Sequence, residues 1–333
     1  MKAAVYKERS VPIKLFVEDI DIGELRRTDV LIKVLYCGVN PIDYWIASGR
    51  YSISPPNNIV GSEAYGVIED LGDDVEGFKI GDRVIVYPWI YCGKCRYCIE
   101  GNENLCLKGG IIGGIVDGCY AEYMVIDHRN VFKVDEKLDE YTAATLPIGA
   151  LTAYHSVKKA GISRDDIVLV LGASGNVGIY VVQYAKLYGA IVIAISRKRW
   201  LKDYGADYVV KFDEVDNLMD ELRLKPTVVI DPIGIDTMSK SLRLLDRGGR
   251  LVTFGTLTGD EVMLDIGFLY RNEITLLGAT GGSRAEFMRV IRDAVSGKLK
   301  PKIWRIFKLH EAEAAINSLW SDERDGKILL KPS

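Results

Sequence analysis

The sequence has no long apolar run. No stretch approaches the roughly 20 apolar residues that a membrane-spanning helix needs. The N-terminus, Met1–Tyr6, lacks the apolar segment of a signal peptide and instead has the pattern of a β-strand. We therefore expect a cytoplasmic protein that has no membrane as a partner.

A large net charge of either sign is also missing. The 43 Lys and Arg residues nearly balance the 46 Asp and Glu residues, for a formal net charge of −3. This balance gives no electrostatic reason to expect nucleic acid or an anionic membrane as the main partner. Repeats, low-complexity tracts and long linkers are absent as well. A chain of 333 residues that is 48% hydrophobic and 27% charged is typical of a globular enzyme with two domains.

One strand–turn–helix pattern organises the chain. The five apolar residues Ile167–Leu171 predict a buried strand, and the apolar spacing from Val177 to Tyr188 predicts a helix. The turn between them has G-x-x-G-x-x-G spacing, which lets a pyrophosphate approach the backbone at the helix N-terminus. Any tight turn could use such glycines, but the next strand, 191–195, completes a βαβ unit and favours dinucleotide binding. The candidate ligands are Gly172, Ser174, Gly175, Asn176, Val177 and Gly178.

The pattern of the chain changes twice, near residues 150 and 280. Residues 1–150 are rich in strands and predict a partly open β-barrel-like domain. Residues 151–280 alternate strand and helix, which predicts an α/β fold with a doubly wound parallel sheet. Residues 281–333 predict a helix, a strand, a second helix and a last strand. Six parallel strands are expected at 167–171, 191–195, 208–210, 227–230, 250–254 and 274–278.

Four of the six cysteines are clustered. Cys92, Cys95, Cys98 and Cys106 have the spacing C-x2-C-x2-C-x7-C, and four thiolates so close in sequence can surround zinc tetrahedrally. All four ligands would come from the protein, so the site would be structural. Four free cysteines in a loop, or an iron–sulfur cluster, are the alternatives that this spacing favours less.

Several motifs together resemble the medium-chain dehydrogenase/reductase superfamily, the group of zinc alcohol dehydrogenases and quinone reductases. They lie in the family's order along nearly the whole chain. The resemblance implies a Rossmann domain (151–280) and a discontinuous GroES-like catalytic domain (1–150 with its zinc lobe at 92–106, and again 281–333). The motifs include Gly38-Val39-Asn40-Pro41-Ile42-Asp43, Gly61–Gly66, Gly77–Val84, Gly205-Ala206-Asp207 and Gly326–Leu330.

The catalytic zinc of that family has no ligands here. The resemblance places its Cys, His and Cys ligands at Asn40, Ser62 and Ile148. None of these three side chains is a competent zinc ligand, so they cannot hold a catalytic zinc ion. The three histidines, at 128, 155 and 310, match no ligand position. The segment Asn40–Asp43 and the later Ser48–Tyr51 instead look like the zinc-free quinone reductase branch. We therefore expect one structural zinc per chain and no catalytic zinc.

The second strand of the Rossmann pattern favours NADPH over NADH. An NAD site usually ends this strand with a carboxylate that binds the ribose hydroxyls. Here the strand ends in Ser196, followed by Arg197 and Lys198, which could bind a 2′-phosphate. The alternative is a solvated basic helix start, which would oppose the helix dipole.

The expected function is NADPH-dependent reduction of quinones or α,β-unsaturated carbonyl compounds. Two alternatives stay open: an alcohol or carbonyl dehydrogenase with an unrecognised metal site, and an NADPH-binding protein without turnover. The resemblance also implies a homodimer or homotetramer. Candidate donors to the substrate oxygen are Asn40, Tyr51, Tyr44 and Ser62. Further cofactor contacts are expected at Thr152, Phe254, Gly255, Gly278, Ala279, Thr280 and Lys327.

Overall fold

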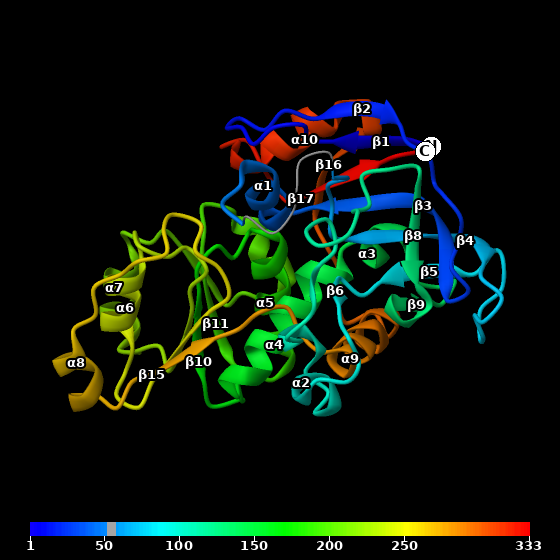
Figure 1. Ribbon diagram of the computed structural model, residues 1–333. Coiled ribbons are helices and arrows are strands. Elements are labelled where there is room, and N and C mark those ends of the chain that lie inside the picture. Colours follow the sequence, from blue (N-terminus) through cyan, green and yellow to red (C-terminus); the bar gives the residue numbers. More distant parts are fainter. Residues whose placement is uncertain (52–57) are drawn as a thin grey trace. The chain divides into compact units, whose positions relative to one another are not determined.

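The computed structural model describes residues 1–51 and 58–333 (Figure 1). It divides into two compact units, Met1–Ile148 with Ser283–Ser333, and Gly149–Gly282. The first unit is thus discontinuous in sequence. It ends at Ile148 and resumes at Ser283, two and three residues from positions 150 and 280, where the sequence pattern changes. Among the described residues, no helix has the length and hydropathy to span a membrane.

The second unit is a doubly wound parallel sheet, as the sequence predicts. Its strand order is β12-β11-β10-β13-β14-β15, and every pair is parallel. The central strands form because their Val, Ile and Leu runs are buried on both faces of the sheet. The elements are α4 (Leu151–Ala160), β10 (Ile167–Val170), α5 (Asn176–Leu187), β11 (Ile191–Ile195), η4 (Arg199–Tyr204), β12 (Tyr208–Val210), α6 (Val215–Leu222), β13 (Val228–Ile230), α7 (Met238–Leu244), β14 (Arg250–Thr253), α8 (Ile266–Arg271) and β15 (Thr275–Gly278).

The first unit is built on a seven-stranded sheet. The order is β16-β17-β3-β4-β5-β9, and β8 also pairs with β3. The blue strand β3 and the red strand β17 lie side by side in Figure 1, so a strand from the first forty residues pairs with the last strand of the chain. Two smaller sheets, β1-β2 and β6-β7, belong to the same unit. The strands of the first unit are β1 (Lys2–Val5), β2 (Phe16–Asp19), β3 (Asp29–Val39), β4 (Ala64–Leu71), β5 (Arg83–Val86), β6 (Trp89–Ile90), β7 (Gly110–Ile111), β8 (Tyr123–Asp127), β9 (Val131–Lys133), β16 (Ile303–Lys308) and β17 (Lys327–Lys331).

Helices of the first unit are mostly short. The first, α1, begins after Asn40, whose backbone N–H is accepted by Asp43 Oδ2 in a capping box, and ends at Gly49 in the left-handed region. Ser283 and Glu286 form a second capping box, at the start of α9. The helices are α1 (Pro41–Ser48), α2 (Arg96–Ile99), η1 (Glu103–Leu105), η2 (His128–Asn130), α3 (Glu140–Ala143), α9 (Arg284–Val295), η5 (Leu309–Glu311), α10 (Ala312–Asn317) and η6 (Ser318–Trp320), with the π-turn η3 (Leu146–Ala150) at the boundary of the units.

Strand β3 begins at Asp29 and runs up to the residue before Asn40. It continues to Val39, because Gly38 and Val39 pair with Leu329 and Ile328 of β17. A side chain at Gly38 would collide with the side-chain ends of Glu63 and Lys327, which would then have to move. The extension brings Asn40, at the start of α1, next to β17.

Candidate active site and metal centre

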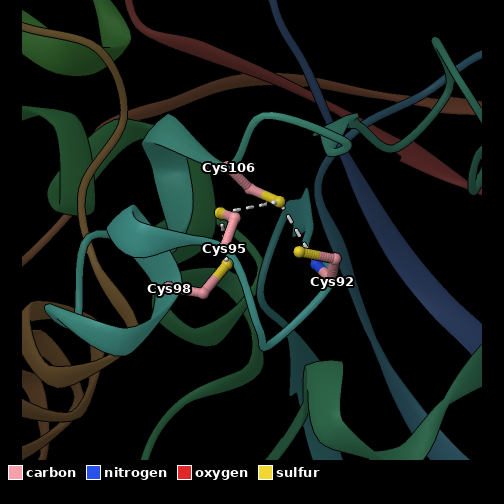
Figure 2. Close-up of side chains that lie close together, drawn as sticks. All are labelled: Cys92, Cys95, Cys98 and Cys106. Carbon is pink, nitrogen blue, oxygen red and sulfur yellow. Dashed lines mark hydrogen bonds between the residues drawn. The ribbon is translucent and has the colours of Figure 1, made fainter.

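The cysteine cluster has the geometry of a metal centre (Figure 2). Its four Sγ atoms lie within 4.8 Å of one another. The Sγ of Cys95 is 3.5 Å from that of Cys98 and 3.9 Å from that of Cys106, close to the roughly 3.8 Å edge of a zinc–sulfur tetrahedron. Backbone N–H groups of Leu107 and Cys98 lower the pKa of Cys95 to about 6. Four protein thiolates in this arrangement fit a structural zinc ion.

A separate group of polar side chains is buried in the first unit. It consists of Asn40, Asp43, Ser62, Glu63 and Lys327, and each is almost fully enclosed. They come from the start of α1, the loop before β4, and the start of β17. Polar groups that expose so little of their surface are satisfied mainly by hydrogen bonds to one another. We call these five residues the buried polar network.

Lys327 donates to three acceptors, two of them in this network. Its Nζ lies 2.7 Å from Glu63 Oε2, 2.7 Å from Asn40 Oδ1 and 3.1 Å from the Val39 carbonyl oxygen. Burial lowers the pKa of the lysine, and the charge of Glu63 opposes that change. A contact with a cofactor phosphate, as the sequence analysis expects for Lys327, would require the ammonium to leave these partners.

Asn40 and Ser62 are also engaged inside the protein. The amide nitrogen of Asn40 donates to Glu63 Oε2 at 3.0 Å and to the Gly38 carbonyl at 3.2 Å. The Ser62 hydroxyl donates to Asp43 Oδ1 at 2.7 Å. In this arrangement the hydrogens of both side chains point to protein acceptors rather than outward to a substrate oxygen. To donate to a substrate oxygen, as the sequence predicts, Asn40 and Ser62 would first have to break these hydrogen bonds within the network.

The third position expected to lack a zinc ligand belongs to the same region. The backbone N–H of Ile148 donates to Glu63 Oε1 at 2.7 Å. One carboxylate thus joins Ile148, Asn40 and Lys327. Of the three positions at which a catalytic zinc would need a Cys or His side chain, two are the network residues Asn40 and Ser62. The third is Ile148, whose backbone N–H donates to Glu63 of the network.

Asp43 is the second buried carboxyl group of the network. Besides Ser62, it accepts hydrogen bonds from the Asn40 backbone at 2.9 Å and from the Tyr120 hydroxyl at 3.1 Å. Burial raises the pKa of Asp43 to about 6, against the lowering effect of these hydrogen bonds. Burial and the Asp43 charge also raise the pKa of Tyr120 well above its usual value. From the sequence, Asp43 is named only as part of a family motif, and Tyr120 is not singled out.

The two candidate tyrosines lie in different surroundings from this network. Tyr44 is buried and packs edge-on against Trp45 and Trp320, with ring centroids 5.4 and 5.3 Å apart. Tyr51 is 46% exposed and directly precedes residues 52–57, which lie outside the described residues. Trp89 has a buried indole N–H without a hydrogen-bond partner in the described structure, which suits a side chain that faces a ligand.

In the second unit, the predicted cofactor residues follow the carboxyl ends of parallel strands. The glycine turn follows β10, Ser196 follows β11, Phe254 and Gly255 follow β14, and Ala279 and Thr280 follow β15. The sheet order reverses between β10 and β13, and ligands of open α/β sheets bind at such a point. Thr152 lies in the first turn of α4.

The glycine turn has the shape that a pyrophosphate requires. Gly172 has φ of +62°, in the left-handed region. A side chain at Gly178 would collide with the backbone of Gly172, so α5 packs directly against the turn. The N-terminal N–H groups of this helix, which runs over Asn176–Leu187, can receive a phosphate. The turn therefore fits a dinucleotide cofactor.

Comparison with known proteins identifies the family. The model of the alcohol dehydrogenase GroES-like domain matches residues 26–136, and that of the zinc-binding dehydrogenase matches residues 176–296. The NAD-dependent alcohol dehydrogenase of Sulfolobus acidocaldarius is 34% identical to this chain, with 99% of both chains covered. The chain belongs to the medium-chain dehydrogenase/reductase superfamily. It is an oxidoreductase of that superfamily, with its GroES-like and Rossmann domains.

Two further members of the superfamily are similar over their whole length. A thermostable alcohol dehydrogenase from Pyrobaculum aerophilum, solved with cobalt and zinc, is 42% identical, with a TM-score of 0.93 and coverage of 100% of this chain and 99% of that one. The acryloyl-coenzyme A reductase of Sulfurisphaera tokodaii is 29% identical, and both chains are fully covered. Relatives of this chain thus include both alcohol dehydrogenases and a reductase of a conjugated thioester.

Proposed function

We propose that this chain reduces quinones or α,β-unsaturated carbonyl compounds with NADPH, and that hydride transfer proceeds without a catalytic zinc. The observation on which the proposal rests is the buried polar network. Asn40 and Ser62 stand where the family's zinc alcohol dehydrogenases have ligands, and a lysine ammonium already occupies the oxygen atoms of Asn40 and Glu63. When bound, the nicotinamide supplies the hydride. A quinone or a conjugated C=C bond needs less polarisation by a metal than a simple aldehyde does.

NADPH consumption with a panel of quinones, enones and enoyl thioesters tests the reaction. Steady-state turnover with at least one acceptor is expected, together with no oxidation of simple alcohols. Absence of turnover with every acceptor would instead support the non-catalytic alternative.

A second candidate is zinc-dependent alcohol oxidation, because several relatives have that name. It requires a second metal site, and among the described residues the four cysteines form the one group of metal-binding side chains found. Alcohol oxidation that tracks a second equivalent of zinc would favour this candidate.

The preference for NADPH is supported by the end of β11. Ser196 Oγ accepts the backbone N–H of Lys198 at 3.1 Å, so a hydroxyl takes the place in which NAD sites have a carboxylate. Arg197 and Arg199 are exposed beside it, where cations can attract a 2′-phosphate. Two relatives are named as NAD-dependent. The dissociation constants of this chain for NADPH and for NADH therefore test the preference. We expect the tighter one for NADPH; tighter binding of NADH would overturn this preference.

We further propose that two copies associate through β15. This strand lies at the edge of its sheet, and its Leu276 is 40% exposed. Nearby Met263, Ile266 and Tyr270 are exposed as well, so an apolar surface adjoins unpaired backbone groups. The molar mass measured by light scattering should be that of at least a dimer, and the Leu276→Lys variant should have a mass closer to that of the monomer. A monomeric wild type would contradict the proposal.

A further inference from the structure

The two buried carboxyl groups of the network differ in their counter-ions. Glu63 has the Lys327 ammonium at 2.7 Å. Asp43 has no Lys, Arg or His nitrogen within ion-pair distance in the part of the chain that the structure describes, although it is fully buried. A buried carboxylate without a counter-ion is costly, so burial favours the protonated form of Asp43.

The protonation of Asp43 decides where the Ser62 hydrogen points. A serine hydroxyl has one hydrogen and can also accept. When Asp43 is ionised, Ser62 must donate to Oδ1, 2.7 Å away. When Asp43 is protonated, its own O–H can donate to Ser62 Oγ, and the serine hydrogen becomes available to another acceptor. The pair is therefore a short chain through which one proton can move.

We propose that Asp43 and Ser62 form the proton relay of this reductase, in which Ser62 protonates the reduced substrate and Asp43 restores the serine proton. The inference rests on the proposed function, in which Ser62 is one of the predicted donors to the substrate oxygen, and it requires the network to open so that Ser62, 1% exposed here, reaches the substrate. Ser62 is the catalytic residue, and Asp43 acts through it.

The step balances for a conjugated carbonyl acceptor. Hydride adds with its electron pair to the β-carbon, and the C=C electrons move towards the carbonyl oxygen. The Ser62 O–H bond breaks as its proton passes to the developing enolate, and the Asp43 proton passes to Ser62 Oγ. Asp43 is left as a carboxylate and takes one proton from solvent before the next turnover. The sum is one acceptor, one NADPH and one proton consumed.

Other groups that face Asp43 are less suited to supply this proton. Tyr120 from the loop before β8 and Cys37 from β3 have pKa values raised far above neutrality by burial. Lys327 of β17 has its hydrogens engaged by three oxygen acceptors. Glu63 is paired with that lysine, and Cys119 Sγ donates to the Glu63 carbonyl at 3.3 Å. Among these groups, Asp43 is the one that has a pKa of about 6 and also contacts Ser62 directly.

The pH profile of kcat for enone reduction by NADPH tests the relay. In the wild type, kcat should fall as the pH rises above about 6, approaching tenfold per pH unit, because the reactive form has Asp43 protonated. Asp43→Asn should lower kcat at least tenfold at pH 6 and abolish the pH dependence between pH 5 and 8. Ser62→Ala should show the same loss, and Ser62→Thr, which keeps the hydroxyl, should recover most of it.

Asp293→Asn is the matched control. Asp293 is also a buried aspartate, on α9, but it is ion-paired with Arg289 and Lys298. Its substitution should leave the pH profile of kcat unchanged even where it lowers the melting temperature. If Asp43→Asn does not fold, the solvent deuterium isotope effect on the wild-type kcat and the Ser62 variants still test the relay.

The outcomes separate the relay from the proposed function. Turnover in which Asp43→Asn keeps the wild-type pH profile, or Ser62→Ala keeps the wild-type rate, would overturn the relay alone. Absence of turnover with every acceptor contradicts the proposed function and the relay together.

Discussion

Lys327 Nζ and Glu63 Oε2 lie 2.7 Å apart although 264 residues separate them in the sequence. The pair joins the last strand, β17, to the loop before β4, and both side chains are buried. Asn40 completes it, since its Oδ1 accepts from the lysine and its amide donates to the same glutamate oxygen. An ammonium group with three oxygen acceptors thus lies beside Asn40, which the sequence predicts to stand in place of a zinc ligand.

Removal of the lysine should destabilise the protein strongly. Lys327→Met leaves Glu63 buried without its counter-ion, which costs about 3–5 kcal/mol. The double variant Lys327→Met/Glu63→Gln should recover much of this loss, because a neutral amide replaces the unpaired charge. Urea unfolding of the three proteins gives the free energies. A single variant that loses less than about 1 kcal/mol would show that the pair contributes little.

Gly38→Ala should disturb the same pair from the backbone. The new Cβ would collide with the Glu63 carboxylate and come within 2.8 Å of Lys327 Nζ. We expect a loss of about 2–3 kcal/mol in the free energy of unfolding, as for other overpacked sites. Gly278→Ala is the control, because that glycine also lies in a strand and has open space around its Cβ position. Equal effects of the two substitutions would contradict this packing.

Asp43 should make stability depend on pH with a defined sign. Its folded pKa is raised from 3.8 to about 6, so the folded state binds the proton more tightly than the unfolded state. The wild type should therefore be most stable, relative to Asp43→Asn, below about pH 4. It should lose about 3 kcal/mol of that advantage as the pH rises through about 6. Urea midpoints across this range measure it; a constant difference would show that Asp43 does not titrate there.

Ser196→Asp should reverse the proposed preference for NADPH. A carboxylate at the end of β11 would repel a 2′-phosphate and could bind the ribose hydroxyls. We expect the dissociation constant for NADPH to rise at least tenfold, about 1.4 kcal/mol, and that for NADH to fall. Fluorescence titration with both nucleotides measures the change. Ser174→Ala, in the glycine turn, should alter both affinities alike and serves as the control.

Much of the fold could be predicted because its signals are local. The buried Val and Ile runs of β10, β11, β13 and β14 and the glycine turn after β10 each show their environment within a few residues. The spacing of the four cysteines likewise brings their sulfur atoms together without long-range information.

The buried polar network could not be predicted, because it depends on strand pairing across the whole chain. The sequence predicts that Lys327 contacts the cofactor, whereas its contacts within the protein follow from the pairing of β17 with β3, which no local pattern shows. One local signal was present. Lys327 is followed by the apolar run Ile328–Leu330, and a lysine that begins so apolar a strand needs a buried acceptor.

The zinc content of active enzyme tests the central claim most directly. Metal analysis should be made on protein whose NADPH turnover with an enone has been measured in the same preparation. We predict one zinc per chain, held by the cysteine lobe and lost in Cys106→Ser. Two zinc ions per chain, with turnover lost as the second is removed, would contradict hydride transfer without a catalytic metal.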